Sequence, residues 1–289
     1  MLFGARTLAM PVKYGQSLDI EEIDDDPGLM FVTHLQGKIW FGANFNSKTL
    51  EIQNTDDCSK ACYLQELLLA ARLLNPKFLK GKKKLLAVAK LNFDVNWGLG
   101  SSSSLISNIA WWANVDPYEL NRLVSKGSGY DIACARSKTA LFYSLTGQVP
   151  TVEHISFIPG YANNTWFVFL EKKEATEANL SITIDKLNPK RSELKEISDI
   201  SARFVTARSV SEIGQLMKRH DEILAEALQK KPVQSLLFID FNGVIKPLGA
   251  WGGDFCMAVS EENEAYVRQY FEQKGFRTVL NFKDVVIPR

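Results

Sequence analysis

The sequence lacks the features that mark a membrane, exported or metal-centred protein. No apolar run among its 289 residues is long enough to span a bilayer, and the N-terminus lacks the layout of a signal peptide. The few cysteines do not have the spacing of metal ligands, and only three histidines could assist them. These absences favour a cytoplasmic protein with free thiols and no membrane partner. The cysteines are Cys58, Cys62, Cys134 and Cys256.

An excess of charge of one sign is also missing. The 34 Lys and Arg residues nearly balance the 33 Asp and Glu residues, which leaves a formal net charge of +1. A nucleic-acid binder normally carries a strong basic footprint, so we expect no nucleic-acid partner. With 46% hydrophobic residues, a chain of this length can bury a sizeable core and form two lobes.

The N-terminal half reads as strands followed by helices. Short apolar segments at residues 29–32 and 38–41 predict strands, and Thr55 is the expected N-cap of a helix that stops at Asn75-Pro76. Further on, Asp116 and Pro117 suit the N-cap and first position of another helix, which we expect to end at Gly127.

The C-terminal half changes pattern after Pro159-Gly160, where we place the boundary between lobes 1–158 and 159–289. A buried strand, two helices and a β–β–α–β order predict an antiparallel sheet, and therefore an α+β fold. The expected elements are a strand at 166–170, helices near 191–206 and 209–229, strands at 236–245 and 255–259, a helix at 261–274 and a strand at 276–282.

The most informative stretch, residues 95–104, reads Val-Asn-Trp-Gly-Leu-Gly-Ser-Ser-Ser-Ser. Alternating apolar positions predict a strand over residues 89–95, and the helical spacing of Leu105, Ile109 and Trp112 predicts a helix after the turn. A turn that opens a helix directs backbone N–H groups and the positive end of the helix dipole to one point, which suits a phosphate.

Two interpretations of this turn are open. It is not a Walker A sequence, because no Gly-Lys-Ser/Thr follows, and glycine and serine also occur where a chain merely turns and caps a helix. One serine is enough for a cap, however, so the remaining hydroxyls could bind phosphate oxygens or Mg²⁺.

A second loop, residues 127–133, reads Gly-Ser-Gly-Tyr-Asp-Ile-Ala and delivers Asp131. This aspartate could cap the next helix, or it could orient or deprotonate a substrate hydroxyl that attacks a γ-phosphate. A third loop, residues 246–254, holds three glycines between two strand-like runs. It could form a wide hairpin with a bulge, or it could let backbone approach a ligand closely.

In this order, the three loops resemble the motifs of the GHMP kinases, the superfamily of galactokinase, homoserine kinase, mevalonate kinase and phosphomevalonate kinase. Residues 98–102 look like the phosphate-binding motif, and residues 127–133 look like a segment of phosphomevalonate kinases and of a bacterial subgroup with Gly-Tyr-Asp-Ile-Ala. Residues 246–254 look like the Lys-Pro-Ser-Gly-Ala-Gly-Gly-Gly-Asp loop. The resemblance covers nearly the whole chain.

The resemblance implies a two-lobe fold, with an N-terminal lobe like ribosomal protein S5 domain 2 and a ferredoxin-like C-terminal lobe. It also implies ATP and Mg²⁺ as cofactors, and a small-molecule acceptor such as mevalonate or phosphomevalonate. By this analogy Asp131 is catalytic and Ser102 is a Mg²⁺ ligand. The ATP phosphates would lie over the turn, at Gly98, Leu99, Gly100, Ser101, Ser102 and Ser103. The acceptor would contact Ser128, Gly249, Ala250, Gly252, Gly253 and Asp254.

Some family members add a glutamate ligand to Mg²⁺. Glu119 lies near that region but one residue off the mevalonate kinase spacing, and a capping box with Asp116 explains it without a metal. Both roles of Glu119 stay open.

The chain departs from the family pattern at three places. Trp251 replaces a glycine, and Leu248 replaces a small hydroxyl residue. Family members also open with a strand bearing Gly-Lys and then Gly-Glu, before a segment like residues 4–11. Since this chain begins at Met1, we expect that strand to be absent and the sheet to expose an edge. Two consequences are open: this form is inactive, or it forms a homodimer through that edge.

The resulting hypothesis is an ATP-dependent kinase that phosphorylates a hydroxyl or phosphate of a mevalonate-like acceptor. The alternatives are an ATP-dependent diphosphomevalonate decarboxylase and a nucleotide-binding protein of this fold without catalytic activity.

Overall fold

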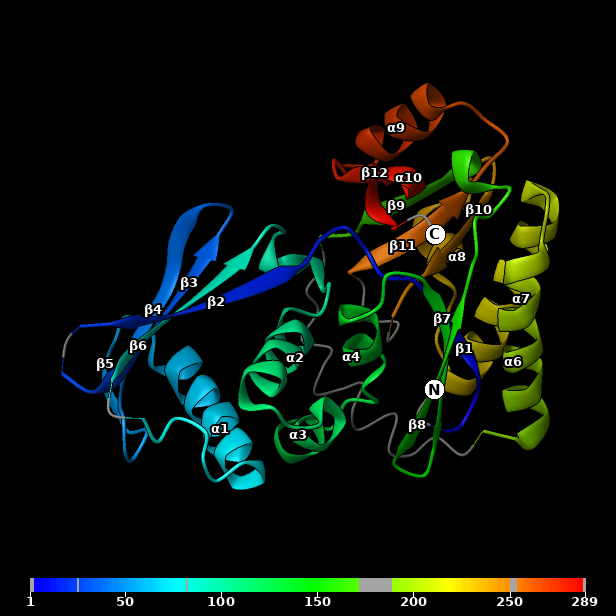
Figure 1. Cartoon of the computed structure of the whole chain (residues 1–289). Helices are drawn as coiled ribbons and strands as arrows, with labels where there is room; N and C mark the ends of the chain where they lie inside the picture. Colours follow the sequence, from blue (N-terminus) through cyan, green and yellow to red (C-terminus); the bar gives the residue numbers. More distant parts are fainter. Residues whose placement is uncertain (1–2, 25, 82, 172–188, 250–253, 288–289) are drawn as a thin grey trace. The chain divides into compact units, whose positions relative to one another are not determined.

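The computed structural model describes residues 3–24, 26–81, 83–171, 189–249 and 254–287, and the chain divides into two compact units (Figure 1). We call Tyr14–Val95 with Leu99–Arg136 the smaller unit. Met1–Lys13, Asn96–Gly98 and Ser137–Arg289 form the larger unit. The boundary passes between Gly98 and Leu99, inside the expected phosphate-binding turn.

The smaller unit contains a five-stranded sheet of order β2-β6-β3-β4-β5. Only β3 and β6 run parallel among its neighbouring pairs. Its strands are β2 (Gln16–Ile23), β3 (Gly28–Leu35), β4 (Lys38–Asn46), β5 (Ile52–Thr55) and β6 (Lys84–Leu91). Its helices are α1 (Cys58–Leu74), α2 (Ser101–Ala113), α3 (Pro117–Val124) and α4 (Tyr130–Ala135).

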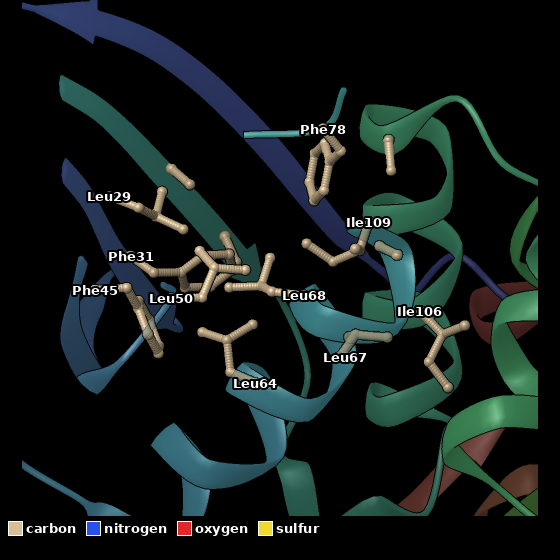
Figure 2. Packing of buried hydrophobic residues seen from close by; sticks show 14 of the residues in the cluster. Leu29, Phe31, Phe45, Leu50, Leu64, Leu67, Leu68, Phe78, Ile106 and Ile109 are labelled. Atoms are coloured by element: carbon tan, nitrogen blue, oxygen red, sulfur yellow. The ribbon is translucent and has the colours of Figure 1, made fainter. Parts of the chain in front are cut away.

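One face of this sheet packs against α1, which in turn contacts α2 and α3. Figure 2 shows Phe31 and Phe45 from the strands meeting Leu64 and Leu68 from α1, with Ile109 of α2 beside them. Each of these side chains is almost fully buried, and burial of one such side chain contributes about 1.5–3 kcal/mol. The N-terminal end of α2 is therefore held on a rigid support.

Three expected boundaries in this unit are wrong. Asp57, not Thr55, is the N-cap of α1, because its carboxylate accepts a hydrogen bond from the Lys60 N–H at 3.0 Å. The strand before the turn ends at Leu91, and Val95–Trp97 is a 3-10 turn, although the alternation that predicted a strand does bury Phe93. Helix α3 ends before Ser125 rather than at Gly127.

The larger unit contains a three-stranded sheet of order β1-β7-β8 and an antiparallel four-stranded sheet of order β10-β11-β9-β12. The first consists of β1 (Thr7–Ala9), β7 (Ala140–Thr146) and β8 (Val149–Ile155). The second consists of β9 (Thr165–Phe169), β10 (Val244–Pro247), β11 (Phe255–Val259) and β12 (Val279–Asn281). The helices are α6 (Arg191–Thr206), α7 (Val210–Leu228), α8 (Val233–Leu237), α9 (Glu264–Gln273) and α10 (Phe282–Val285).

The β–β–α–β order predicted for the C-terminal half is confirmed by β10, β11, α9 and β12. Part of one strand prediction is wrong, because residues 233–237 form the short helix α8 and the strand begins only at Val244. An aromatic cluster centred on Phe271 of α9 and Phe238 at the end of α8 packs in the core beside this sheet.

The compact units group the chain differently from the expected lobes 1–158 and 159–289. Strand β1 pairs with β7 and also contacts α6, so the N-terminal residues and β7–β8 pack with the C-terminal elements. This grouping results from contacts between segments that are far apart in the sequence. Such contacts cannot be predicted from the change of sequence pattern along the chain.

Candidate functional site

The turn at residues 98–103 has the backbone geometry of an anion site. Gly98 and Gly100 both have positive φ angles, +64° and +77°, which residues with a Cβ rarely adopt. Gly100 is the N-cap of α2, and no side chain caps this helix. By contrast, α1, α3, α7 and α9 are each capped by a side chain. The N–H groups of the first turn of α2 are thus left to a ligand or to water.

Asp131 lies against this turn, within the smaller unit. A Cβ added to Gly100 would lie 3.6 Å from the Asp131 Cβ and 3.8 Å from its Cγ. Asp131 is the second residue of α4, whose N-cap is Gly129, and no side chain caps α4 either. The structure therefore removes the capping interpretation of Asp131 and brings its carboxyl group beside the start of α2.

The environment of Asp131 favours its protonated form. Burial raises the pKa of Asp131 to about 6, and a hydrogen bond from Tyr130 opposes this rise. Burial, with the nearby Asp131, also raises the pKa of the Cys134 thiol to about 12, so this cysteine stays protonated. At neutral pH Asp131 is mostly ionised but is a stronger base than an ordinary aspartate.

The four serines of the turn are not equivalent. The Ser104 hydroxyl lies 2.9 Å from both the Ser101 carbonyl and the Gln16 side-chain oxygen, so it serves the packing of α2. The Ser102 side chain is exposed, and it opposes the rise that burial causes in the pKa of Tyr63 on α1. Ser102 is the exposed serine of the turn, and its role as a ligand of Mg²⁺ stays a prediction.

The donor set of the turn fits Mg²⁺ bound together with a nucleotide. Mg²⁺ prefers oxygen ligands and commonly takes one or two from the protein and the rest from phosphates and water. The Ser102 hydroxyl beside an uncapped helix N-terminus supplies such an oxygen next to a place for phosphates. Within the described part of the chain, no group of three or more His, Cys, Asp or Glu side chains could hold a metal without a substrate.

Glu119 has the capping-region position that the sequence predicted. Its backbone N–H donates to Asp116 at 2.8 Å, and its exposed carboxylate lies 4.0 Å from Arg122. Asp116 is confirmed as the N-cap of α3, and Pro117 as its first residue. A metal role for Glu119 stays a prediction.

The third loop is described only at its ends. Ala250, Gly252 and Gly253, with Trp251, lie outside the described residues, whereas Gly249 has a φ of +62°. Within the larger unit, a Cβ added to Gly98 would lie 2.0 Å from an Asp254 carboxylate oxygen. The ring of the next residue, Phe255, packs edge-to-face against the Trp97 ring, with 5.9 Å between the ring centres. Asp254 therefore packs directly on the first glycine of the turn.

Two sets of polar residues escaped the sequence analysis. Tyr63 is one, and no sequence signal could have shown that Ser102, 39 positions later, influences its pKa. The other is a buried group in the larger unit, formed by Lys246, Asp221 and His220. Ser128 is half-buried in the loop before α4, and its predicted contact with an acceptor stays a prediction.

Comparisons with known proteins identify the fold. No family model and no curated protein matches the sequence. Among solved structures, Methanococcus jannaschii mevalonate kinase matches with a TM-score of 0.69 and 18% identity, over 96% of this chain and 91% of that one. Streptococcus pneumoniae phosphomevalonate kinase matches at 0.65 and 13%, over 96% and 91%.

Lactococcus lactis galactokinase also matches, with a TM-score of 0.59 and 13% identity, over 94% of this chain and 84% of that one. The chain therefore has the α+β fold of the GHMP kinases, as the three loops predicted. At these identities the similarity concerns the fold alone. In the parts of the chain that the structure describes, we find no helix both long and apolar enough to cross a bilayer.

Proposed function

We propose that this protein is an ATP- and Mg²⁺-dependent small-molecule kinase that phosphorylates a hydroxyl or phosphate of a mevalonate-like acceptor. The observation that carries the proposal is the closeness of Asp131 to Gly100, which brings a half-buried carboxyl group to an uncapped helix N-terminus. The kinase fold of the chain supports it independently.

In this proposal the nucleotide phosphates lie over residues 98–103, where the first N–H groups of α2 and the helix dipole stabilise their charge. Ser102 supplies one oxygen to Mg²⁺, and the metal neutralises charge that develops on the phosphates during transfer. Ser128, in the loop before α4, is the proposed acceptor contact in the smaller unit, and the acceptor contacts expected at residues 249–254 stay predictions.

Asp131 is the catalytic base. Its carboxylate takes the proton of the acceptor hydroxyl while the hydroxyl oxygen bonds to the γ-phosphorus. The bond from this phosphorus to the β–γ bridging oxygen breaks, and ADP leaves with that oxygen. A pKa of about 6 suits this task, since the group is ionised at neutral pH and still accepts a proton readily.

The same carboxylate favours a hydroxyl over a phosphate as the acceptor group. A phosphate oxygen is already ionised at neutral pH and needs no base, and a nearby carboxylate would repel it. Within the mevalonate-like class, we therefore place an alcohol first.

The test is incubation of the full chain with Mg·ATP and, separately, mevalonate, phosphomevalonate and diphosphomevalonate. Mass spectrometry of the products and release of CO₂ separate kinase from decarboxylase activity. We expect ADP and a phosphorylated product without CO₂. ATP binding without turnover of these acceptors or other small alcohols would contradict the kinase and support a protein that only binds nucleotides.

A further inference from the structure

Strand β2 forms an open edge of the five-stranded sheet in the smaller unit. Among the described residues its only neighbouring strand is β6, with which it pairs over all 8 of its residues. Just before the strand, the Asn92 N–H donates to the Gly15 carbonyl. Because successive residues of a strand direct their backbone groups to opposite edges, every second residue after Gly15 faces β6. The backbone groups of Leu18, Ile20 and Glu22 therefore point out of the sheet, and no other described residue hydrogen-bonds to them.

Helix α2 covers the start of this edge, where the Asn108 side-chain amide donates to the Gln16 carbonyl at 2.9 Å. Farther along, Trp111 of α2 lines an open hollow together with Leu18 and Ile20, whose side chains are half-buried. Trp111 is 64% exposed. An exposed indole beside half-buried aliphatic side chains forms an apolar surface that is typical of interaction sites. Protection of an edge strand from aggregation requires charges and does not require such a surface.

The opposite face of the same edge is acidic. Asp19 and Glu21 line the hollow from this face, and six of the eight residues in the range 19–26 are acidic. The Lys90 ammonium lies 2.9 Å from the Asp19 carboxylate, whereas Glu21 forms no ion pair with another described residue. An incoming strand therefore finds apolar side chains on one face and negative charge on the other.

The charge decides which occupant suits this edge. Two copies of the chain joined through β2 would bring acidic side chains of one strand opposite those of the other, and like charges in that position are destabilising. A strand with basic residues would instead gain from the same charges. A basic segment is therefore favoured over a second copy.

We propose that β2 binds an extended, basic segment of a partner protein, which adds to the sheet as a further strand. Side chains alternate between the two faces of a strand, so the segment alternates apolar and basic residues. Its apolar side chains contact Leu18, Ile20 and Trp111, and its basic side chains lie beside Asp19 and Glu21. All these residues belong to the smaller unit, and the inference does not depend on the proposed kinase activity.

The experiment is calorimetric titration of the full chain with the end-blocked peptide Lys-Val-Lys-Val-Lys-Val-Lys. A peptide with glutamate in place of lysine is the charge control, and we expect no saturable binding of it. Two further peptides carry N-methyl groups, one on the valines and one on the three lysines that follow them. Since successive N–H groups of a strand point to opposite edges, only one of these peptides loses its hydrogen bonds to β2. That peptide should bind about tenfold more weakly or worse, and the other should bind like the parent.

Variants of the chain test the two faces separately. W111A should weaken binding of the basic peptide about tenfold or more, as loss of a central aromatic residue commonly does. E21Q should weaken it about two- to fivefold, the range of an exposed ion pair. The matched control is W40A, which removes another partly exposed indole from β4, three strands away in the sheet. We expect W40A to bind the peptide normally and all variants to melt within a few degrees of the unmodified chain.

Three outcomes would overturn the inference. Equal binding of the two methylated peptides would mean that charge attracts the peptide without strand pairing. Normal binding to W111A would mean that the hollow beside α2 is not the site. Sedimentation showing that the chain alone forms a dimer, and that W111A abolishes it, would assign the β2 edge to a second copy.

Discussion

Asp131 in the smaller unit is half-buried and Lys246 in the larger unit is buried, and the surroundings of these two ionisable groups differ. Burial raises the pKa of Asp131 to about 6, and the hydrogen bond that opposes this comes from the neutral Tyr130. Burial lowers the pKa of Lys246 to about 8, but here the opposing influence is a carboxylate, Asp221. The charged form of Lys246 is therefore stabilised by an opposite charge, whereas the charged form of Asp131 is stabilised by the neutral hydroxyl of Tyr130.

The surroundings of Lys246 are those of a structural group. Its ammonium donates to the Pro247 carbonyl at 2.8 Å, at the base of the β10–β11 hairpin. His220, whose Nδ1 has no hydrogen-bond partner, stays neutral because burial and the charge of Lys246 hold its pKa well below the usual range.

Asp131 instead faces the uncapped start of α2. The comparison indicates that a buried ionisable group that interacts with an opposite charge, such as Lys246 with Asp221, has a structural role. An ionisable group with a shifted pKa beside an uncapped helix N-terminus, such as Asp131, is more typical of a reaction site.

The largest effect that separates the two regions is on catalysis. D131N should reduce phosphoryl transfer by about 10²–10⁴-fold, because the amide cannot accept the acceptor's proton. K246M should leave transfer within about tenfold of the unmodified chain. Steady-state rates with Mg·ATP and the identified acceptor check this. Full activity of D131N would contradict the role of Asp131, whatever happens to Lys246.

The next effect is on stability and concerns Lys246. K246M removes the cation that interacts electrostatically with Asp221, which is only 4% exposed, and we expect a loss of about 3 kcal/mol in the free energy of unfolding. The double variant K246M/D221L should regain most of this loss. Urea unfolding followed by tryptophan fluorescence measures both. A single variant as stable as the unmodified chain would show that the pair contributes nothing.

A third difference is in pH dependence. Asp131 has a raised pKa when folded, so the free energy of unfolding should fall as pH rises from about 4 to 6. Lys246 has a lowered pKa when folded, so its contribution should make stability rise between about pH 8 and 10.5. Over its pH range, each change in the free energy of unfolding should total about 2–3 kcal/mol.

The two slopes can be assigned by substitution. D131N should remove only the acid slope and should stabilise the chain at pH 7, whereas K246M/D221L should remove only the alkaline slope. Thermal unfolding over this pH range is the measurement. Persistence of the acid slope in D131N would assign it to other groups.

The smallest effect distinguishes two glycines with nearly equal backbone angles. Gly98 and Gly249 have φ of +64° and +62°, but a Cβ on Gly98 meets Asp254, whereas a Cβ on Gly249 meets no atom of the described residues within 4 Å. G249A should cost about 1 kcal/mol for its backbone conformation alone. We expect G98A to cost about 1 kcal/mol more, and D254A to relieve that excess. Equal costs in chemical denaturation would show that Asp254 simply rotates away.

The fold could be predicted largely because its signals are local. Asp116 and Pro117 start α3 as expected, since a cap requires only the residues next to it. The three glycine loops, with their order, led to the kinase fold. The predictions that failed also have local causes. Alternation continued past Leu91 because Phe93 is buried, although the chain leaves the sheet there, and the apolar segment before Val244 fits a short helix as well as a strand.

The site was predictable only as a list of residues. Asp131 and Gly100 stand out in the sequence, but capping and catalysis were equal readings of Asp131 until α4 proved to be capped by Gly129. Nothing in the sequence indicated that Tyr63 and Ser102 influence each other, because their helices, α1 and α2, come together only in the folded chain.

The sequence by itself determined the α+β class, the positions of the glycine turns and the residues able to carry chemistry, because hydrophobic periodicity, caps and positive-φ glycines act over a few residues. The tertiary structure alone decided which of those residues meet. The Asp131 carboxyl beside Gly100 and the closeness of Lys246 to Asp221 both depend on burial and packing between distant segments. Burial is also what moves their pKa values, since a charge is destabilised only when the folded chain removes it from water.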